Sequence, residues 1–100
     1  MYGHQLIGIF ERLHDLELTD SRNSFSIQWC GRSRDLLRDY DRRNGAYSKV
    51  NQHVVIRLRQ RLAEAATLVP DDIAAQIREI DAAIVRDLYV ANLLGRRSVR

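Results

Sequence analysis

The spacing of arginines gives this sequence its clearest chemical signal. Arg34, Arg38 and Arg42 recur at every fourth position. On a helix this spacing places three guanidinium groups in one stripe. A guanidinium group can donate two parallel hydrogen bonds to a phosphate or to the edge of a guanine. The stripe therefore predicts a surface that contacts nucleic acid.

The basic residues are concentrated in the middle of the chain. Residues 31–63 carry nine basic and three acidic side chains, whereas residues 1–30 and 64–87 are both net acidic. Such clustering suits a polyanionic partner, because each neutralised phosphate releases condensed counterions. Of the 16 basic residues only Lys49 is not arginine. A genome rich in G and C would also favour arginine over lysine, but it would not explain the clustering.

Two short helices that meet at a glycine are expected to position the stripe. Phe25 and Trp29 lie four residues apart, so both rings fall on one face of the first helix and are expected to be buried. Gly31 follows, and glycine readily adopts the left-handed backbone that ends many helices. Ser33 can cap the second helix. The buried positions of that helix are expected to be Leu37 and Tyr40, or Leu36 and Tyr40. This order is typical of a helix-turn-helix over residues 21–43, whose second helix enters the DNA major groove.

The motif Phe25-Ser26, Trp29 and Gly31-Arg32-Ser33, followed by Leu36, Leu37 and Tyr40, resembles the helix-turn-helix of small lambda-repressor-like regulators. The resemblance covers about a quarter of the chain. It implies that the base-reading residues lie early in the second helix. The spacing from Phe25 to Gly31 is one residue longer than the commonest arrangement, so either the turn has an extra residue or Cys30 takes the anchor place of Trp29.

The arginine pattern and the resemblance together predict a double-stranded DNA site. Its candidate residues are Arg32, Ser33, Arg34, Arg38, Arg42 and Arg43. Asp35 and Asp39 depart from a basic surface, because acids repel phosphate unless they accept a hydrogen bond from cytosine or pair with a nearby arginine.

Three further helices are expected around this motif. Apolar periodicity predicts a first helix over residues 3–18 and a fourth over residues 48–68. The alternation from Ile56 onward also mimics a strand, but the following RLAEAATL favours a helix. Asn44-Gly45 is a stop signal between the helix-turn-helix and the fourth helix.

A long fifth helix is expected over residues 70–94, closed by Gly95. Pro70 and the acids after it favour a helix start. One apolar seam runs through Ile73, Ile77, Ile80 and Ile84, and a second apolar strip lies beside it. Two apolar sides exceed what a core of this size covers, so a homodimer is expected. The predicted dimer interface comprises Ile84, Val85, Leu88, Tyr89 and Leu93.

The predicted fold is therefore all-α: a five-helix bundle that contains a helix-turn-helix, with a long C-terminal helix. One domain is expected over residues 1–95, with a helical hairpin over residues 48–94 and a mobile basic tail over residues 96–100. No apolar run is long enough to cross a bilayer, so no membrane association is expected. The single cysteine, Cys30, fits a reducing cytoplasm and a structural thiol. No cofactor or metal is expected.

A dimeric, sequence-specific DNA-binding regulator is the function that these features favour. The alternative is a helical protein-interaction module, such as an anti-activator or assembly factor, with the aspartates as counter-charges of a solvated arginine face. Residues 76–97 also resemble the first helix of all-helical chorismate mutases through Arg78, Asp81 and Arg86. That match covers one helix at the wrong end of the chain, and we expect no enzyme.

Overall fold

The computed structural model describes residues 1–41 and 45–98, with side chains described for all of these except Ala46 and residues 89–98. The predicted all-α fold is confirmed. The helices are α1 (Gly3–Asp15), α2 (Arg22–Ser24), α3 (Leu36–Asp41), α4 (Gln52–Ala66) and α5 (Asp71–Ser98). A π-helical turn (Phe25–Trp29) continues α2, and a 3₁₀ turn (Gly45–Tyr47) precedes α4. Among the described residues the β-structure is a single bridge between Tyr2 and Lys49.

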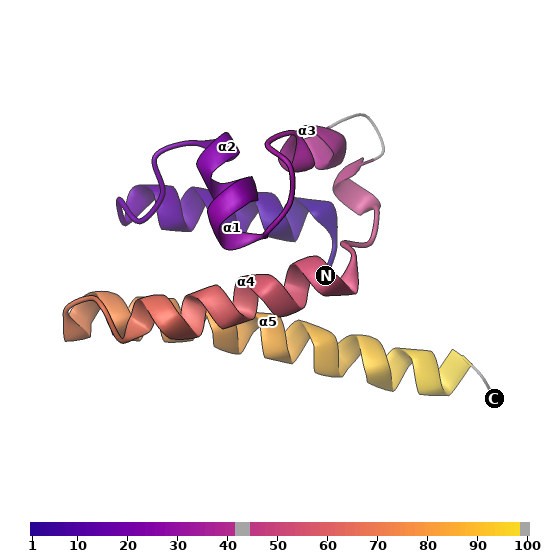
Figure 1. Ribbon diagram of the computed structural model, residues 1–100. Helices are drawn as coiled ribbons and strands as arrows, with labels where there is room; N and C mark the ends of the chain where they lie inside the picture. The colour runs from indigo at the N-terminus through magenta and orange to yellow at the C-terminus, as the bar shows by residue number, and fades with distance from the viewer. Residues whose placement is uncertain (42–44, 99–100) are drawn as a thin grey trace.

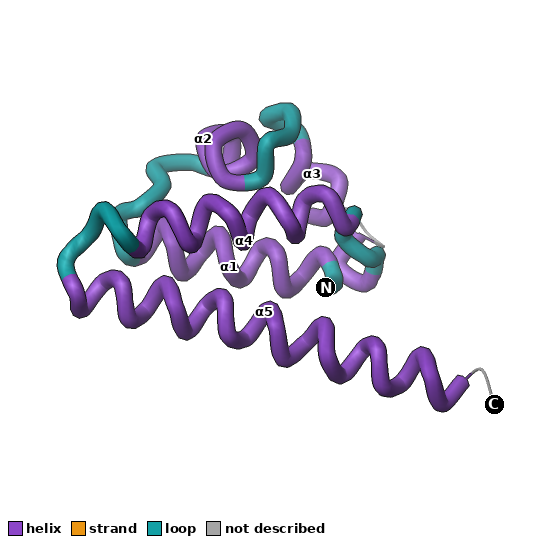
Figure 2. The backbone as a smooth tube through the Cα atoms, turned by 60° about the horizontal axis from the view of Figure 1, so that its bottom comes forward, coloured by secondary structure: helices purple, strands orange, loops and turns teal. Residues whose placement is uncertain are grey.

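The helices form two layers around one core. In Figure 1, α2 and α3 lie above α1, and α4 and α5 run antiparallel below it. Figure 2 agrees, since α5 again lies on the opposite side of the molecule from α2 and α3. The core between the layers is built from large apolar side chains with almost no exposure. They include Leu6, Leu13, Phe25, Leu37, Leu58, Leu62, Ile77, Ile80 and Ile84.

The end of α1 is set by a residue that sequence reasoning did not single out. The helix ends at Asp15, three residues earlier than predicted. Glu17 takes a positive φ of 61°. Its N–H donates to the carbonyl of His14, and the N–H of Leu18 donates to that of Leu13. This pair of bonds is a Schellman motif, which satisfies the last helical carbonyls and turns the chain away.

The segment from Gln52 to Ala66 is helical, so the strand alternative is wrong. Asn51 caps α4 by accepting a hydrogen bond from the N–H of His53 at 2.8 Å, which places the start four residues later than predicted. The predicted apolar face is confirmed at Val54, Leu58 and Leu62, which are all buried.

The fifth helix does not end at Gly95 as predicted but continues to Ser98. A single glycine costs a helix only about 1 kcal/mol relative to alanine, and its neighbours Leu94 and Arg96 are good helix formers. The predicted tail is therefore helical up to Ser98. Among the described residues, no helix combines the length and the apolar content that crossing a bilayer requires.

The isoleucine seam of α5 packs against α1 and α4, as expected. Polar contacts at its edges hold the three helices together. Gln5 Nε2 donates to Asp87 at 3.0 Å, and Arg59 pairs with Asp81 at 2.8 Å. Ile84 is only 1% exposed and belongs to this chain's own core. The prediction that its side chain contacts a dimer partner is therefore wrong. Val85 is exposed and Leu88 partly buried, while the side chains of Tyr89 and Leu93 lie outside the described residues.

Candidate nucleic-acid interface

The glycine corner predicted from the sequence is present. Ser21 caps α2 through its Oγ, which accepts from the N–H of Ser24 at 3.1 Å. Gly31 has φ of +64°, the left-handed conformation expected of it. The N–H of Arg32 then donates to the carbonyl of Ser26 at 2.9 Å, which folds the chain back on the helix.

The extra residue between Phe25 and Gly31 is absorbed by the π-helical turn. The N–H of Cys30 donates to the carbonyl of Phe25, five residues earlier, at 3.2 Å. A bond of this kind encloses one residue more than an α-helical turn. Both Trp29 and Cys30 are therefore buried, at 3% and 2% exposure. Cys30 does not replace Trp29 as the buried anchor of the first helix, because both side chains lie in the core. Burial raises the pKa of the Cys30 thiol to about 12, so the thiol stays protonated at neutral pH, as expected of a structural cysteine.

Gly31 offers the most direct check of this corner. A Cβ added there would lie 3.1 Å from Cγ of Arg57, and L-residues are strained at this φ. Gly31→Ala should lower the free energy of unfolding by about 1–2 kcal/mol, measured by urea denaturation. Gly8, inside α1, has open space around its own added Cβ. Gly8→Ala is the matched control and should instead stabilise by about 0.5–1 kcal/mol. Equal effects at the two glycines would contradict the left-handed backbone conformation of Gly31.

The second helix of the motif begins later than predicted. It begins at Leu36, so Arg32, Ser33 and Arg34 lie in the turn before it and not in its first turn. The N–H of Leu36 donates to the carbonyl of Ser33 at 3.2 Å, so Ser33 takes part in the turn that starts the helix. Leu37 is the fully buried position, and Leu36 and Tyr40 are partly buried. The backbone bond from Leu36 to Ser33 spans three residues, so regular α-helix starts later than the sequence pattern implied.

The predicted arginine stripe is only partly formed. Arg38 is exposed on α3, whereas Arg34 precedes the helix. Arg42 and Arg43 lie outside the described residues. Within the described chain the stripe does not run along one continuous helix, because its first residue, Arg34, lies in the turn before α3.

A groove between α2 and α3 gathers the described part of the stripe. It has a volume of about 350 Å³. It is lined by Arg22, Asn23, Arg34, Asp35, Leu37, Arg38 and Asp41. Arg22 forms an ion pair with Asp41 across the groove and so ties α2 to α3. Pairing with a nearby arginine was one of two ways in which Asp35 could be tolerated here, and it is not formed: within the described residues Arg34 and Arg38 carry no ion pair.

Helix α4 contributes basic residues to the same corner, which sequence reasoning missed. Arg57 lies beside Gly31, and Arg61 stacks over the ring of Trp29 with its guanidinium 5.6 Å from the ring centroid. Arg61 Nε also donates to the carbonyl of Gln28 at 3.2 Å. The signal that could have revealed this contact is the spacing His53, Arg57, Arg61, which places three side chains in one row on a helix.

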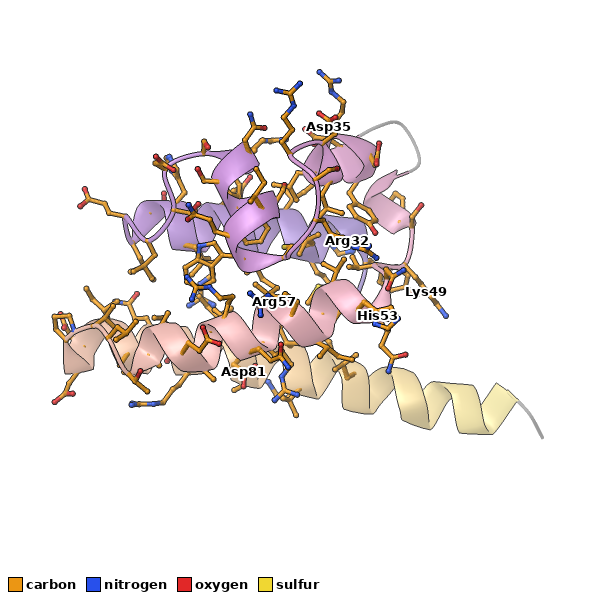
Figure 3. All side chains as sticks on the ribbon, in the orientation of Figure 1. Arg32, Asp35, Lys49, His53, Arg57 and Asp81 are labelled. Atoms are coloured by element: carbon orange, nitrogen blue, oxygen red, sulfur yellow. The ribbon has the colours of Figure 1, made fainter. Side chains whose placement is uncertain are left out.

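Figure 3 shows Arg32, Lys49, His53 and Arg57 near the first half of α4 and the turn that faces it. We refer to these four residues as the basic face. All four are exposed, and in the described chain none of them forms an ion pair with an acid. The basic face thus carries three positive charges with no acidic member, whereas the groove beside α3 mixes both signs.

The other candidate chemistry is sparse. The ring of His4 stacks on that of Tyr2 and meets that of Tyr47 edge-on, with 6.1 Å between the ring centroids in each pair. No group of three or more His, Cys, Asp or Glu side chains in the described part of the chain could hold a metal ion. Asp81, part of the chorismate-mutase-like pattern, pairs with Arg59 and raises the pKa of that arginine through the hydrogen bond between them.

Comparisons of the chain with protein-family models, with curated proteins and with solved structures found no match.

Proposed function

We propose that this protein is a sequence-specific DNA-binding regulator that uses residues 21–43 as a helix-turn-helix of the lambda-repressor-like kind. The observation that carries the proposal is the corner at Gly31. It buries Trp29 and Leu37 in the core and leaves Arg38 exposed on α3. A helix held in this way can enter a major groove with its exposed face toward the bases.

Two charged surfaces have different roles in this proposal: one contacts the bases and the other contacts the phosphates. Arg34 and Arg38 are the described side chains that we assign to base edges, because both are exposed and line the groove beside α3. The basic face supplies the attraction to phosphates, since its three cations are not balanced by acids. Phosphate contacts of this kind fix the position of a recognition helix but do not read sequence.

A homodimer is part of the proposal. Helix-turn-helix dimers place their recognition helices about 34–36 Å apart, one turn of DNA, and therefore bind palindromic sites. A dimer formed through α5 would leave α3 of both copies free, because α5 lies on the side opposite α2 and α3 (Figure 1).

Salt dependence of binding to random duplex DNA tests the phosphate contacts. The logarithm of the binding constant should fall linearly with the logarithm of salt concentration. Lys49→Ala and Arg57→Ala should each reduce the slope by about 1, as measured by fluorescence anisotropy. Arg12→Ala removes the same charge on the α5 side, where Arg12 lies near Glu79, and should leave the slope unchanged. Equal slopes for all variants would remove the basic face from the DNA contact.

A protein-interaction module is the second candidate. The observation in its favour is the mixed charge around α3, where Asp35 and Asp39 stand beside Arg34 and Arg38. Such a surface suits a protein partner with alternating charges better than it suits phosphate. Absence of any binding to duplex DNA at low salt, with circular dichroism showing the helical fold, would favour this candidate.

A further inference from the structure

We propose that the exposed side of the α4–α5 hairpin is a twofold interface, in which α5 of a second copy lies antiparallel to α5 of the first. The inference rests on the homodimer in the proposed function and defines its geometry. It does not require DNA, so it can be tested separately from DNA binding.

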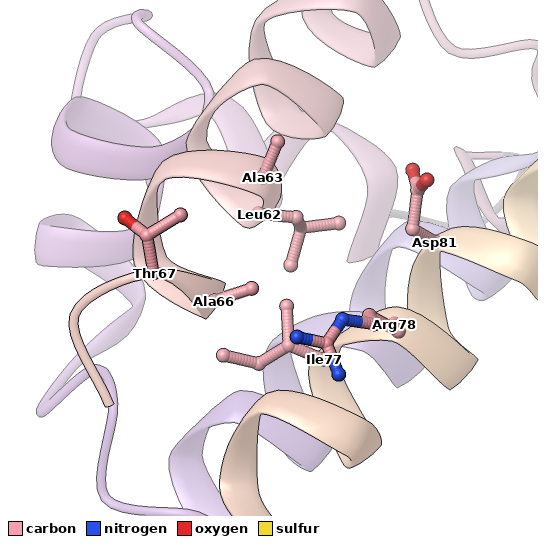
Figure 4. A pocket seen from close by; sticks show the side chains of 7 residues that line it. All are labelled: Leu62, Ala63, Ala66, Thr67, Ile77, Arg78 and Asp81. Carbon is pink, nitrogen blue, oxygen red and sulfur yellow. The ribbon is translucent and has the colours of Figure 1, made fainter. Parts of the chain in front are cut away.

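The hairpin has an apolar and small-residue surface along its seam. Ile56 on α4 and Val85 on α5 are 47% and 43% exposed. Each lies about one helical turn from the Arg59–Asp81 ion pair, on the same side of it. On the other side of the pair is a groove of about 280 Å³, lined in part by Ala63, Ala66 and Arg78 (Figure 4). Small side chains along a seam allow another helix to approach closely.

The length of α5 also points to a partner. The helix has 28 residues, whereas α4 has 15. Figures 1 and 2 show its C-terminal part extending past the ends of α1 and α4. The sequence of residues 89–98 nevertheless contains four large apolar residues, Tyr89, Val90, Leu93 and Leu94. In an antiparallel pair, each extension would lie along the first half of the partner's α5.

The charge distribution along α5 favours a second copy of this chain, in antiparallel orientation, as the partner at this surface. Residues 71–84 contain four acids and one arginine, a net charge of −3. Residues 85–98 contain three arginines and one acid, a net charge of +2. An antiparallel pair places each acidic half against a basic half, whereas a parallel pair would place like charges together and weaken association.

The terminal charges also interact favourably with the dipole of their own helix, which favours acids at the start and arginines at the end. The two explanations differ for a double reversal. Reversing both ends is doubly unfavourable for the helix dipole, but it restores the complementarity between two copies.

Sedimentation equilibrium of the full chain without DNA provides the test. The wild type should be a dimer at tens of micromolar. The pair Asp71→Arg and Asp72→Arg should weaken the dimer at least about tenfold, and so should the pair Arg96→Glu and Arg97→Glu. The four substitutions combined should restore the wild-type dimer constant to within about threefold. Val85→Glu should give a monomer with unchanged circular dichroism.

A monomeric wild type would overturn the inference. So would half-variants that dimerise as tightly as the wild type, which a parallel pair would give, or a combined variant that associates no better than the half-variants. A chain that dimerises in this way but does not bind DNA would keep the interface and remove only the proposed function. A chain that binds DNA as a monomer would remove the interface and the homodimer, and would keep only the DNA-binding part of the proposed function.

Discussion

Trp29→Ala should lower the free energy of unfolding by about 3–5 kcal/mol, the usual cost of truncating a large buried aromatic side chain. Trp29 is 3% exposed, and Arg61 covers its ring. The ring anchors the π-helical turn to α4, so its loss opens a cavity beneath the Gly31 corner. Domains of this size are stable by about 5–15 kcal/mol in total, so the variant should lose a large fraction of its stability. Thermal and urea denaturation measure the loss.

Ile27→Ala is the matched control, because Ile27 lies in the same π-helical turn but is 55% exposed. Its effect should stay within about 0.5 kcal/mol. The wild-type tryptophan emission should be blue-shifted and protected from quenchers. A red-shifted, freely quenched emission would place Trp29 at the surface and contradict the position of the corner.

Arg38→Ala should weaken binding to a specific DNA site by about 1–3 kcal/mol, because a guanidinium that reads guanine donates two hydrogen bonds that alanine cannot replace. Arg38 is the described arginine that lies on α3 itself. It is exposed and forms no ion pair within the described chain, so its removal should leave stability nearly unchanged. Binding to random DNA should change far less than binding to the specific site.

Arg12→Ala controls for the loss of one positive charge. Arg12 is exposed on α1 and lies 3.8 Å from Glu79 on α5, away from α3. Its removal should reduce specific binding only slightly. If Arg38→Ala and Arg12→Ala weakened specific binding equally, α3 would not be the helix that reads the DNA.

Local sequence signals predicted the corner well. Gly31 and Leu37 act through short-range physics: a left-handed backbone and a buried helical position. Such effects depend on a few neighbouring residues and can be read from their spacing. The isoleucine seam of α5 was predictable for the same reason.

The features that the sequence did not reveal depend on contacts between distant segments. The basic face joins Arg32 to Lys49 and Arg57 only because α4 crosses beside the turn after Gly31. The continuation of α5 through Gly95 shows that the helix-forming neighbours of a glycine can outweigh its tendency to end a helix.

Selection of binding sites from a pool of random duplex DNA tests the proposed function most directly. The account predicts enrichment of a palindromic site whose two halves lie about one helical turn apart, bound at least about 1,000-fold more tightly than scrambled DNA at physiological salt. Arg38→Ala should lose most of that preference. A pool that shows no enriched sequence after repeated rounds, with the wild-type chain folded, would contradict sequence-specific DNA binding.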